Sequence, residues 1–268
     1  MTPLNQLIIG IKGAGEMASA VAWRLYNSGF RKIFMMETDY PLAVRRKVSF
    51  CEAIHEGRAV VEGIVAIRVN GLDEIKSAWD KTQIAVMVDP EWTIIKQLRP
   101  QVIIDAILAK KNLGTNRNES SLVIGLGPGF TAPEDVHLVI ETNRGHNLGR
   151  IINNGEAEKD TGVPGIIGGY TEERVLRAPA EGLFRANSSI GDLVKAGAIL
   201  GSVNEKKVRA GIDGALRGLI RSDTLVTQGL KIGDIDPRGD QGYCFTISDK
   251  ARAIAGSVLE AILRQYNV

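Results

Sequence analysis

The chain is poor in cysteine and in aromatic residues, and it carries no strong excess of charge. Its two cysteines, Cys51 and Cys244, are too far apart for a metal-ligand spacing and too few for a disulfide scaffold. We therefore expect a reduced, cytoplasmic protein with no disulfide and no bound metal. The 33 basic and 31 acidic residues leave a net charge of +2, too weak a bias to predict binding to nucleic acid or to an anionic membrane.

Long hydrophobic runs are also lacking. The apolar segment Leu7–Ile11 is too short for a signal peptide core or a membrane span. Hydrophobic residues make up 44% and charged residues 24% of the 268 positions, as in an ordinary globular protein. The sequence therefore predicts a protein that neither enters nor crosses a membrane.

Glycine, by contrast, is plentiful and unevenly distributed. Between Gly114 and Gly242 lie 22 of the 30 glycines. We expect a nucleotide-binding domain over residues 1–165, a glycine-rich β domain over 166–247 and a C-terminal helix over 248–268. Ser248 is the expected cap of that helix.

The first part of the chain has the pattern of a strand, a glycine turn and a helix. The apolar run Leu7–Ile11 is followed by Gly13-Ala14-Gly15-Glu16 and by a helical pattern that ends at Gly29. A second apolar strand, Lys32–Met36, leads to Glu37, 22 residues after Gly15. This order is typical of a dinucleotide-binding unit.

Such a unit has a direct chemical use. Gly13 and Gly15 would allow a tight turn and a close approach of backbone N–H groups to a pyrophosphate, whose charge the helix N-terminus favours. Glu37 would accept hydrogen bonds from ribose hydroxyls. The sequence thus predicts a Rossmann-like domain that binds a dinucleotide, with a tight but empty turn as the alternative.

Further elements alternate as a parallel sheet requires. Asp89 and Asp105 follow two of the expected strands, where they serve either catalysis or, more commonly, the capping of turns and helices. The expected strands are Ala59–Val69, Ile84–Val88 and Val102–Ile107, and the expected helices are Pro41–Ile54, Asp73–Trp79 and Trp92–Leu98.

A second glycine loop follows the strand that ends at Ile124. We interpret Arg144 and His146 as partners of an anion beside the backbone amides of Gly127 and Gly129; the alternative is that they brace the junction between domains. A metal site made by His137, Glu141 and His146 is not favoured, because their spacing matches no standard ligand pattern.

The glycine-rich part contains an internal repeat. Residues 181–203 and 213–235 align without a gap, with identical residues at six of 23 positions. A unit this short cannot bury its apolar face alone, so the two copies are expected to clasp each other about a pseudo-twofold axis. The six identical pairs are Gly182 and Gly214, Arg185 and Arg217, Leu193 and Leu225, Val194 and Val226, Gly197 and Gly229, and Gly201 and Gly233.

This repeat resembles the biotinyl/lipoyl-type barrel-sandwich hybrid, through Ala178–Gly182, Val194–Gly197 and Ala210–Gly214. In the carrier domains of that type a lysine between the two halves is modified. Lys206 and Lys207 stand in the corresponding segment but lack flanking methionines, so a solvated turn is favoured over a modification site. The expected fold class is therefore an α/β Rossmann-like parallel-sheet domain, then a small all-β barrel-sandwich hybrid domain and a C-terminal helix.

Four stretches together resemble the YqeB family over essentially the whole chain: residues 13–16, 125–130, 141–146 and 229–238. The last includes Asp234, Asp236 and Arg238; the carboxylates of this loop either bind a cation or cap turns. Two of the stretches also resemble, more distantly, the xanthine dehydrogenase accessory factors. The resemblance implies an accessory role in the maturation of a selenium-dependent molybdenum hydroxylase, with that enzyme or its maturation machinery as partner.

The leading hypothesis from the sequence is a maturation factor that binds a molybdopterin dinucleotide or an NAD-like cofactor. One alternative is an NAD(P)-dependent oxidoreductase, although His55, Lys110 and Asp105 form no recognisable catalytic pattern. Another is a non-enzymatic scaffold with an empty turn. The identity of the ligand, any catalysed reaction and the formation of a homo-oligomer stay open at this level.

Overall fold

The computed structural model describes residues 3–267 and divides into two compact units. The first unit comprises residues 3–41, 49–160 and 247–267, and the second comprises 42–48 and 161–246. The chain thus leaves the first unit twice. Residues 42–48 add a short segment to the second unit, and the C-terminal helix belongs to the first.

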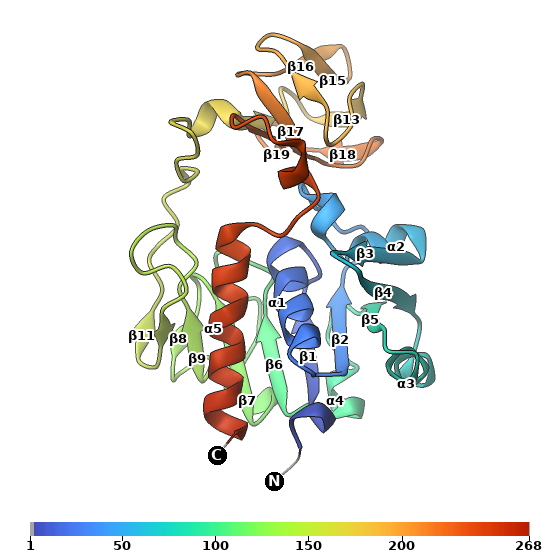
Figure 1. Ribbon diagram of the computed structural model, residues 1–268, viewed down its shortest axis with the longest axis vertical. Coiled ribbons are helices and arrows are strands. Elements are labelled where there is room, and N and C mark those ends of the chain that lie inside the picture. Colours follow the sequence, from blue (N-terminus) through green and yellow to red (C-terminus); the bar gives the residue numbers. More distant parts are fainter. Residues whose placement is uncertain (1–2, 268) are drawn as a thin grey trace. The chain divides into compact units, whose positions relative to one another are not determined.

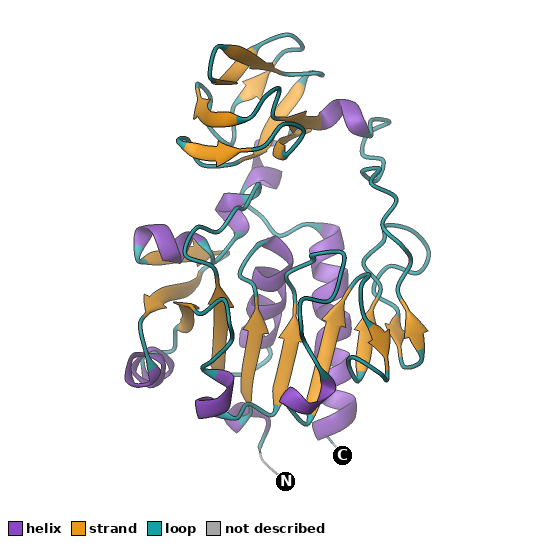
Figure 2. Cartoon of the chain, turned by 180° about the vertical axis from the view of Figure 1, so that it is seen from behind, coloured by secondary structure: helices purple, strands orange, loops and turns teal. Residues whose placement is uncertain are grey.

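A nine-stranded mixed sheet forms the centre of the first unit (Figures 1 and 2). Its order is β10-β9-β7-β6-β1-β2-β5-β4-β3. The inner strands run parallel, whereas β3 and β10 at the two edges are antiparallel to their neighbours. The strands are β1 (Ile8–Lys12), β2 (Lys32–Glu37), β3 (Arg58–Val61), β4 (Ile64–Val69), β5 (Ile84–Val88), β6 (Val102–Asp105), β7 (Leu122–Leu126), β9 (Leu138–Ile140) and β10 (Ile151–Ile152). A separate small sheet pairs β8 (Thr131–Ala132) with β11 (Gly155–Glu156).

Two long helices, α1 (Glu16–Asn27) and α5 (Asp249–Tyr266), pack side by side on one face of this sheet (Figure 1). α1 ends where Gly29 adopts a φ of 96°, as a helix-terminating glycine does. α5 begins at Ser248, whose hydroxyl accepts a hydrogen bond from the Ala251 amide, as predicted. The shorter helices are α2 (Glu52–Glu56), α3 (Leu72–Asp80) and α4 (Ile95–Leu98).

The second unit consists of two four-stranded antiparallel sheets, ordered β12-β19-β17-β14 and β16-β15-β13-β18. Its core is a single apolar cluster that includes Phe184, Val203, Leu216 and Ile235. The strands are β12 (Val175–Arg177), β13 (Gly182–Ala186), β14 (Leu193–Val194), β15 (Ile199–Val203), β16 (Lys206–Arg209), β17 (Gly214–Leu219), β18 (Thr224–Val226) and β19 (Lys231–Asp236).

The two copies of the internal repeat pair with each other through their strands. Val194 of the first copy pairs with Gly214 of the second, and the equivalent residues Val226 and Gly182 pair in the reciprocal direction. Each copy therefore gives one strand to the sheet of the other. The two copies thus pair reciprocally at equivalent positions.

The predicted fold class is wrong. The large sheet is mixed rather than parallel, because both of its edges carry an antiparallel strand. The regular alternation of strands and helices also fails after β6, since the chain reaches β7 and then β9 without an α-helix. The rest of the chain forms several small antiparallel sheets, and the C-terminal helix α5 packs against α1 in the first unit.

Two individual predictions also need correction. The expected strand Ala59–Val69 is a hairpin of β3 and β4, because Glu62 and Gly63 adopt φ values of 41° and 84°, which suits a tight hairpin turn. The expected helix Pro41–Ile54 is absent. Residues Arg46–Val48 form one 3₁₀ turn, and α2 begins only at Glu52.

Candidate functional site

The candidate site lies where β1 and β6 end in the first unit. β2 follows β1 on one side of it, whereas β6 lies on the other side, and open α/β sheets place ligands at such a reversal. Gly13 continues β1 with a φ of 86°, and a Cβ on it would lie 3.3 Å from the Ile107 Cα. Glycine is therefore required at position 13 by its backbone angle and by the loop after β6.

Glu37, at the end of β2, lies beside this turn. Its Oε2 accepts the Ala14 amide hydrogen at 2.8 Å, and its Oε1 accepts the Thr38 amide at 2.9 Å. A carboxylate can accept about four hydrogen bonds. The Glu37 side chain is half-buried, and its oxygens can accept further hydrogen bonds from a ligand. The structure thus brings together the turn and the acidic residue that the sequence singled out.

Gly15 differs from Gly13 because the fold does not demand a glycine there. Its φ is −70°, which any residue adopts, and a Cβ would meet no atom within 4 Å. It occupies the cap position of α1 without a capping side chain, where serine would serve better than glycine. The missing side chain leaves open space directly over the helix N-terminus.

Glu16 links the starts of α1 and α5. Its Oε1 accepts the Ser248 hydroxyl hydrogen at 2.9 Å, and Ser248 caps α5. Both helices begin at the sheet edge where β1 and β6 end (Figure 1). Two positive helix-dipole ends therefore converge on this edge and favour an anion there.

A buried lysine, Lys12, lies at this sheet edge and was not among the residues expected from the sequence. The Lys12 Nζ donates to Thr115 Oγ1 at 2.7 Å, lies 2.7 Å from Glu119 Oε2 and stands 3.5 Å from the ring centre of Trp92. Its side chain is fully buried. Burial lowers the pKa of Lys12 despite the opposing effect of Glu119. The sequence does contain a signal for this buried lysine, because Lys12 ends an apolar strand directly before a glycine turn.

Asp105 belongs to the same cluster, whereas Asp89 does not. Thr115 donates its hydroxyl hydrogen to Asp105 Oδ2 at 2.6 Å, and the Ile107 amide donates to Oδ1 at 3.2 Å. Asp105 thereby fixes the residue that packs on Gly13. Asp89 instead accepts the amides of Thr93 and Ile94, which is the capping role that the sequence favoured.

Asp105 gives the first unit a specific pH dependence. Burial raises its pKa above the ordinary value of 3.8, so its contribution to folding is full below that pH and is lost as the pH rises through the folded pKa. We expect the free energy of unfolding of the native chain to fall, relative to that of Asp105→Asn, as the pH rises above the ordinary carboxyl pKa of 3.8. Urea unfolding at several pH values measures this, and a difference that stays flat across the range would contradict it.

The loop between β6 and β7 carries unusual backbone conformations. Leu108 and Lys110 adopt φ values of 61° and 64°, which are costly for residues with side chains and are often found at binding sites. Lys110 pairs with Asp160 at 2.9 Å. This loop also contacts the second glycine loop, since a Cβ on Gly129 would lie 2.6 Å from the Lys111 Cα.

The second glycine loop itself is explained by packing. Gly127 and Gly129 adopt φ values of 80° and 108°, and a side chain on Gly127 would collide with Thr142. Arg144 forms two hydrogen bonds with Asp249, at 2.6 and 3.0 Å, and His146 is exposed. The Gly127 amide donates to the Ile140 carbonyl at 2.9 Å, so this amide is already used within the chain.

A polar hollow of about 480 Å³ lies beside β10 in the first unit, lined by Glu141, Asn147, Arg150, Glu158 and neighbouring residues. Among these residues, Glu141 has a structural role. Glu141 accepts the amides of Asn143 and Glu158 at 2.6 and 2.7 Å. His137 also has a structural role, because its Nδ1 accepts the Val123 amide.

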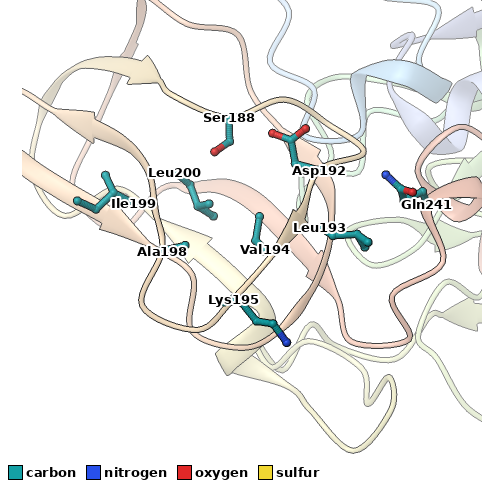
Figure 3. A pocket seen from close by; sticks show the side chains of 9 residues that line it. All are labelled: Ser188, Asp192, Leu193, Val194, Lys195, Ala198, Ile199, Leu200 and Gln241. Atoms are coloured by element: carbon teal, nitrogen blue, oxygen red, sulfur yellow. The ribbon is translucent and has the colours of Figure 1, made fainter.

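The second unit has a hollow of about 570 Å³ at β14 and β15 (Figure 3). Leu193 lines it and is 63% exposed, and its repeat equivalent Leu225 is 71% exposed. Lys206 and Lys207 are exposed on β16. The remaining lining residues are Ser188, Asp192, Val194, Lys195, Ala198, Ile199, Leu200 and Gln241.

The carboxylates at the end of β19 are paired with arginines. Asp234 binds Arg174, and Asp236 accepts hydrogen bonds from Arg238 at 2.9 and 2.7 Å. Across residues 3–267, no group of three or more His, Cys, Asp or Glu side chains is arranged to hold a metal ion. Within the same residues, no helix is both long and apolar enough to cross a membrane.

Comparison with solved structures finds matches with very low TM-scores. They include an aspartoacylase family protein from Mesorhizobium loti, 10% identical, with a TM-score of 0.26 over 79% of this chain and 58% of that one. Product-bound EutE (DoeB) from Ruegeria pomeroyi is also 10% identical, with a TM-score of 0.24 over 78% and 58% of the two chains. These scores support neither a shared fold nor a shared function.

Sequence comparison is more informative. No family model matches the chain, but it is 46% identical over 261 residues to a protein of Escherichia coli (strain K12) named as uncharacterized protein YqeB. The match covers 97% of this chain and 48% of that protein. The chain thus spans about half the length of this relative. Over nearly its whole extent it is a homologue of YqeB, which supports its resemblance to the YqeB family.

Proposed function

We propose that the chain binds a nucleotide-bearing cofactor where β1 and β6 end, and that it serves the maturation of a selenium-dependent molybdenum hydroxylase. The observation that carries the binding proposal is the open space over Gly15, beside the Glu37 carboxylate and at the N-terminus of α1. A pyrophosphate suits that terminus, since backbone N–H groups and the helix dipole both favour negative charge.

The nucleoside end of the ligand has a partner in Glu37. A ribose presents two hydroxyl donors, and the Glu37 carboxylate keeps acceptor capacity after binding the amides of Ala14 and Thr38. A molybdopterin dinucleotide and NAD share these groups. The role in hydroxylase maturation rests on the resemblance to the YqeB family, with the hydroxylase or its maturation machinery as the partner.

A second candidate function is a scaffold without a nucleotide. It is favoured by the bond from the Ala14 amide to Glu37, because the turn then satisfies one of its own donors within the chain. In this case the Glu37 carboxylate takes the place of a ligand's pyrophosphate at the turn, instead of binding a ligand's ribose. The two candidates differ in what happens when the space over Gly15 is filled.

Substitution of Gly15 and Glu37 tests the binding proposal. Gly15→Ser suits the backbone angle and improves the helix cap, so we expect unchanged or slightly higher stability but at least about 10-fold weaker NAD binding, because the side chain occupies the ligand's space. Glu37→Gln removes the charge and one strong acceptor, which should weaken NAD binding by about 10- to 100-fold. Titration calorimetry gives both affinities.

The matched control is Glu74→Gln, which removes an exposed carboxylate on α3. It should leave NAD binding unchanged. If Gly15→Ser and Glu37→Gln both bind NAD as the native chain does, the nucleotide proposal fails and the scaffold is favoured. For the maturation role, a host strain carrying Gly15→Ser should lose molybdenum hydroxylase activity while the amount of hydroxylase polypeptide stays normal.

A further inference from the structure

Thr115 lies at the centre of a buried chain of polar contacts that starts at the residue before the glycine turn. Its hydroxyl oxygen accepts a hydrogen from the Lys12 ammonium at 2.7 Å, and its own hydroxyl hydrogen goes to Asp105 Oδ2 at 2.6 Å. Thr115 and Asp105 are each 2% exposed, and Lys12 is fully buried. Because an ammonium accepts no hydrogen bond, the Lys12 contact directs the single hydroxyl hydrogen of Thr115 to Asp105.

The contacts continue from Asp105 to the glycine turn. The Ile107 amide donates to Asp105 Oδ1 at 3.2 Å, so the two oxygens of this carboxylate bind Thr115 and Ile107. The Ile107 backbone lies against Gly13, with its Cα 3.3 Å from the place that a Cβ on this glycine would take. Thr115 is therefore connected, through one carboxylate, to the backbone that packs on the turn.

The bond between Thr115 and Asp105 also joins the two ends of the loop that follows β6. Asn112 keeps Thr115 in place, because its Oδ1 accepts the Thr115 amide and its Nδ2 donates to the Thr115 carbonyl, each at 2.8 Å. Between these ends, Leu108 and Lys110 adopt φ values of 61° and 64°. Such conformations persist only where the surrounding structure holds them, and the closed loop provides that hold.

We propose that Thr115 is a positioning residue for the ligand turn: its hydroxyl holds the loop after β6 against Gly13 and so keeps the turn in the shape that binds the ligand. This inference rests on the proposed function and adds to it a residue that is too buried to contact the ligand. A turn that is already held in place needs no ordering when the ligand binds, and avoiding that ordering cost raises the affinity.

A purely structural role of Thr115 predicts a different result. In that case the loss of the hydroxyl lowers the stability of the first unit, because Asp105 Oδ2 loses its donor. The molecules that remain folded then bind NAD as the native chain does. Affinity measured on fully folded protein therefore separates positioning from stability.

Thr115→Val tests the proposal, because it removes the hydroxyl and keeps a similar side-chain shape. At a temperature at which tryptophan fluorescence shows every variant to be folded, titration calorimetry should give NAD binding at least about 10-fold weaker than native in Thr115→Val. Thr115→Ser keeps the hydroxyl and should bind within about threefold of native. Hydrogen exchange read by mass spectrometry should show lost protection in Thr115→Val over residues 105–116, with native protection restored in Thr115→Ser.

The matched control is Thr93→Val. Thr93 donates its hydroxyl hydrogen to Asp89 Oδ1 at 3.0 Å, so it forms the same type of bond at the end of β5, two strands away from β1 in the sheet. This variant should leave both NAD binding and the hydrogen exchange of residues 105–116 unchanged.

Each outcome bears on the proposal. Native NAD affinity in folded Thr115→Val overturns it, and so does unchanged hydrogen exchange over residues 105–116. Equal weakening in Thr115→Ser or in Thr93→Val also overturns it, because the hydroxyl of Thr115 would then not be the cause. If Thr115→Val does not fold, Thr115→Ala is measured in its place, with the same readings.

The failure of this inference can be told from the failure of the proposed function. If the native chain binds no NAD, the proposed function fails, and the hydrogen exchange of Thr115→Val alone decides whether the hydroxyl holds the loop. If NAD binding needs Glu37 but is the same in Thr115→Val as in the native chain, the positioning role fails and the proposed function stands.

Discussion

Lys12→Met should destabilise the first unit by about 3 kcal/mol, because it removes one partner of a buried ion pair and leaves the other without compensation. The Glu119 carboxylate is only 14% exposed and would lose the ammonium 2.7 Å away. Thr115 would lose the donor that binds its hydroxyl oxygen, and Trp92 would lose the cation over its ring. Methionine fills a similar volume, so the loss reports on polar contacts rather than on a cavity.

Urea unfolding followed by tryptophan fluorescence measures this effect selectively. All three tryptophans, Trp23, Trp79 and Trp92, lie in the first unit. Lys76→Met, at an exposed position on α3, should change the free energy of unfolding by no more than about 0.5 kcal/mol. Adding Glu119→Leu to Lys12→Met should recover part of the loss, because the orphaned carboxylate is then gone. A Lys12→Met variant as stable as the native chain would show that the cluster contributes nothing.

Gly214→Ala should destabilise the second unit by about 3 kcal/mol or more, whereas Gly182→Ala at the equivalent repeat position should cost much less. A Cβ on Gly214 would lie 2.3 Å from the Asp236 carbonyl oxygen, in the backbone of the neighbouring strand. A Cβ on Gly182 would meet the Asn204 side-chain amide instead, and that side chain can move. Both positions have positive φ values, 155° and 143°, so the backbone strain is similar.

Hydrogen exchange read by mass spectrometry distinguishes the two variants. Peptides from β17 and β19 should lose protection in Gly214→Ala and largely keep it in Gly182→Ala, while peptides from β1 and β6 serve as an internal control in both. Equal loss of protection in the two variants would mean that the backbone angle, and not the contact with β19, decides the cost.

Local patterns predicted the turn of the candidate site well. The order of strand, Gly13-Ala14-Gly15 and helix, with an acidic residue at the end of the next strand, placed Glu37 beside the turn, as the bond to Ala14 shows. These relations depend on neighbours in sequence and on the geometry of adjacent parallel strands. The repeat was predictable for a similar reason, since identical residues at a fixed offset adopt equivalent pairings.

Contacts between distant parts of the chain were not predictable. The expected helix Pro41–Ile54 fails because Val44 joins the second unit, where its carbonyl accepts the Leu219 amide at 2.8 Å, and hydrophobic periodicity does not show that partner. The parallel-sheet prediction fails because the turn at Glu62 and Gly63 reverses the chain, so that β3 pairs with β4 in the antiparallel direction. In the sequence Lys12 is only the end of a strand, because its ion-pair partner Glu119 lies far along the chain.

The central claim is that the space over Gly15 holds a nucleotide-bearing cofactor. Native mass spectrometry of the chain purified from its own host tests it most directly. We expect an added mass that corresponds to a nucleotide-bearing cofactor on the native chain and its loss from Gly15→Ser, with both chains folded. A bare native chain, or the same added mass on Gly15→Ser, would contradict the claim.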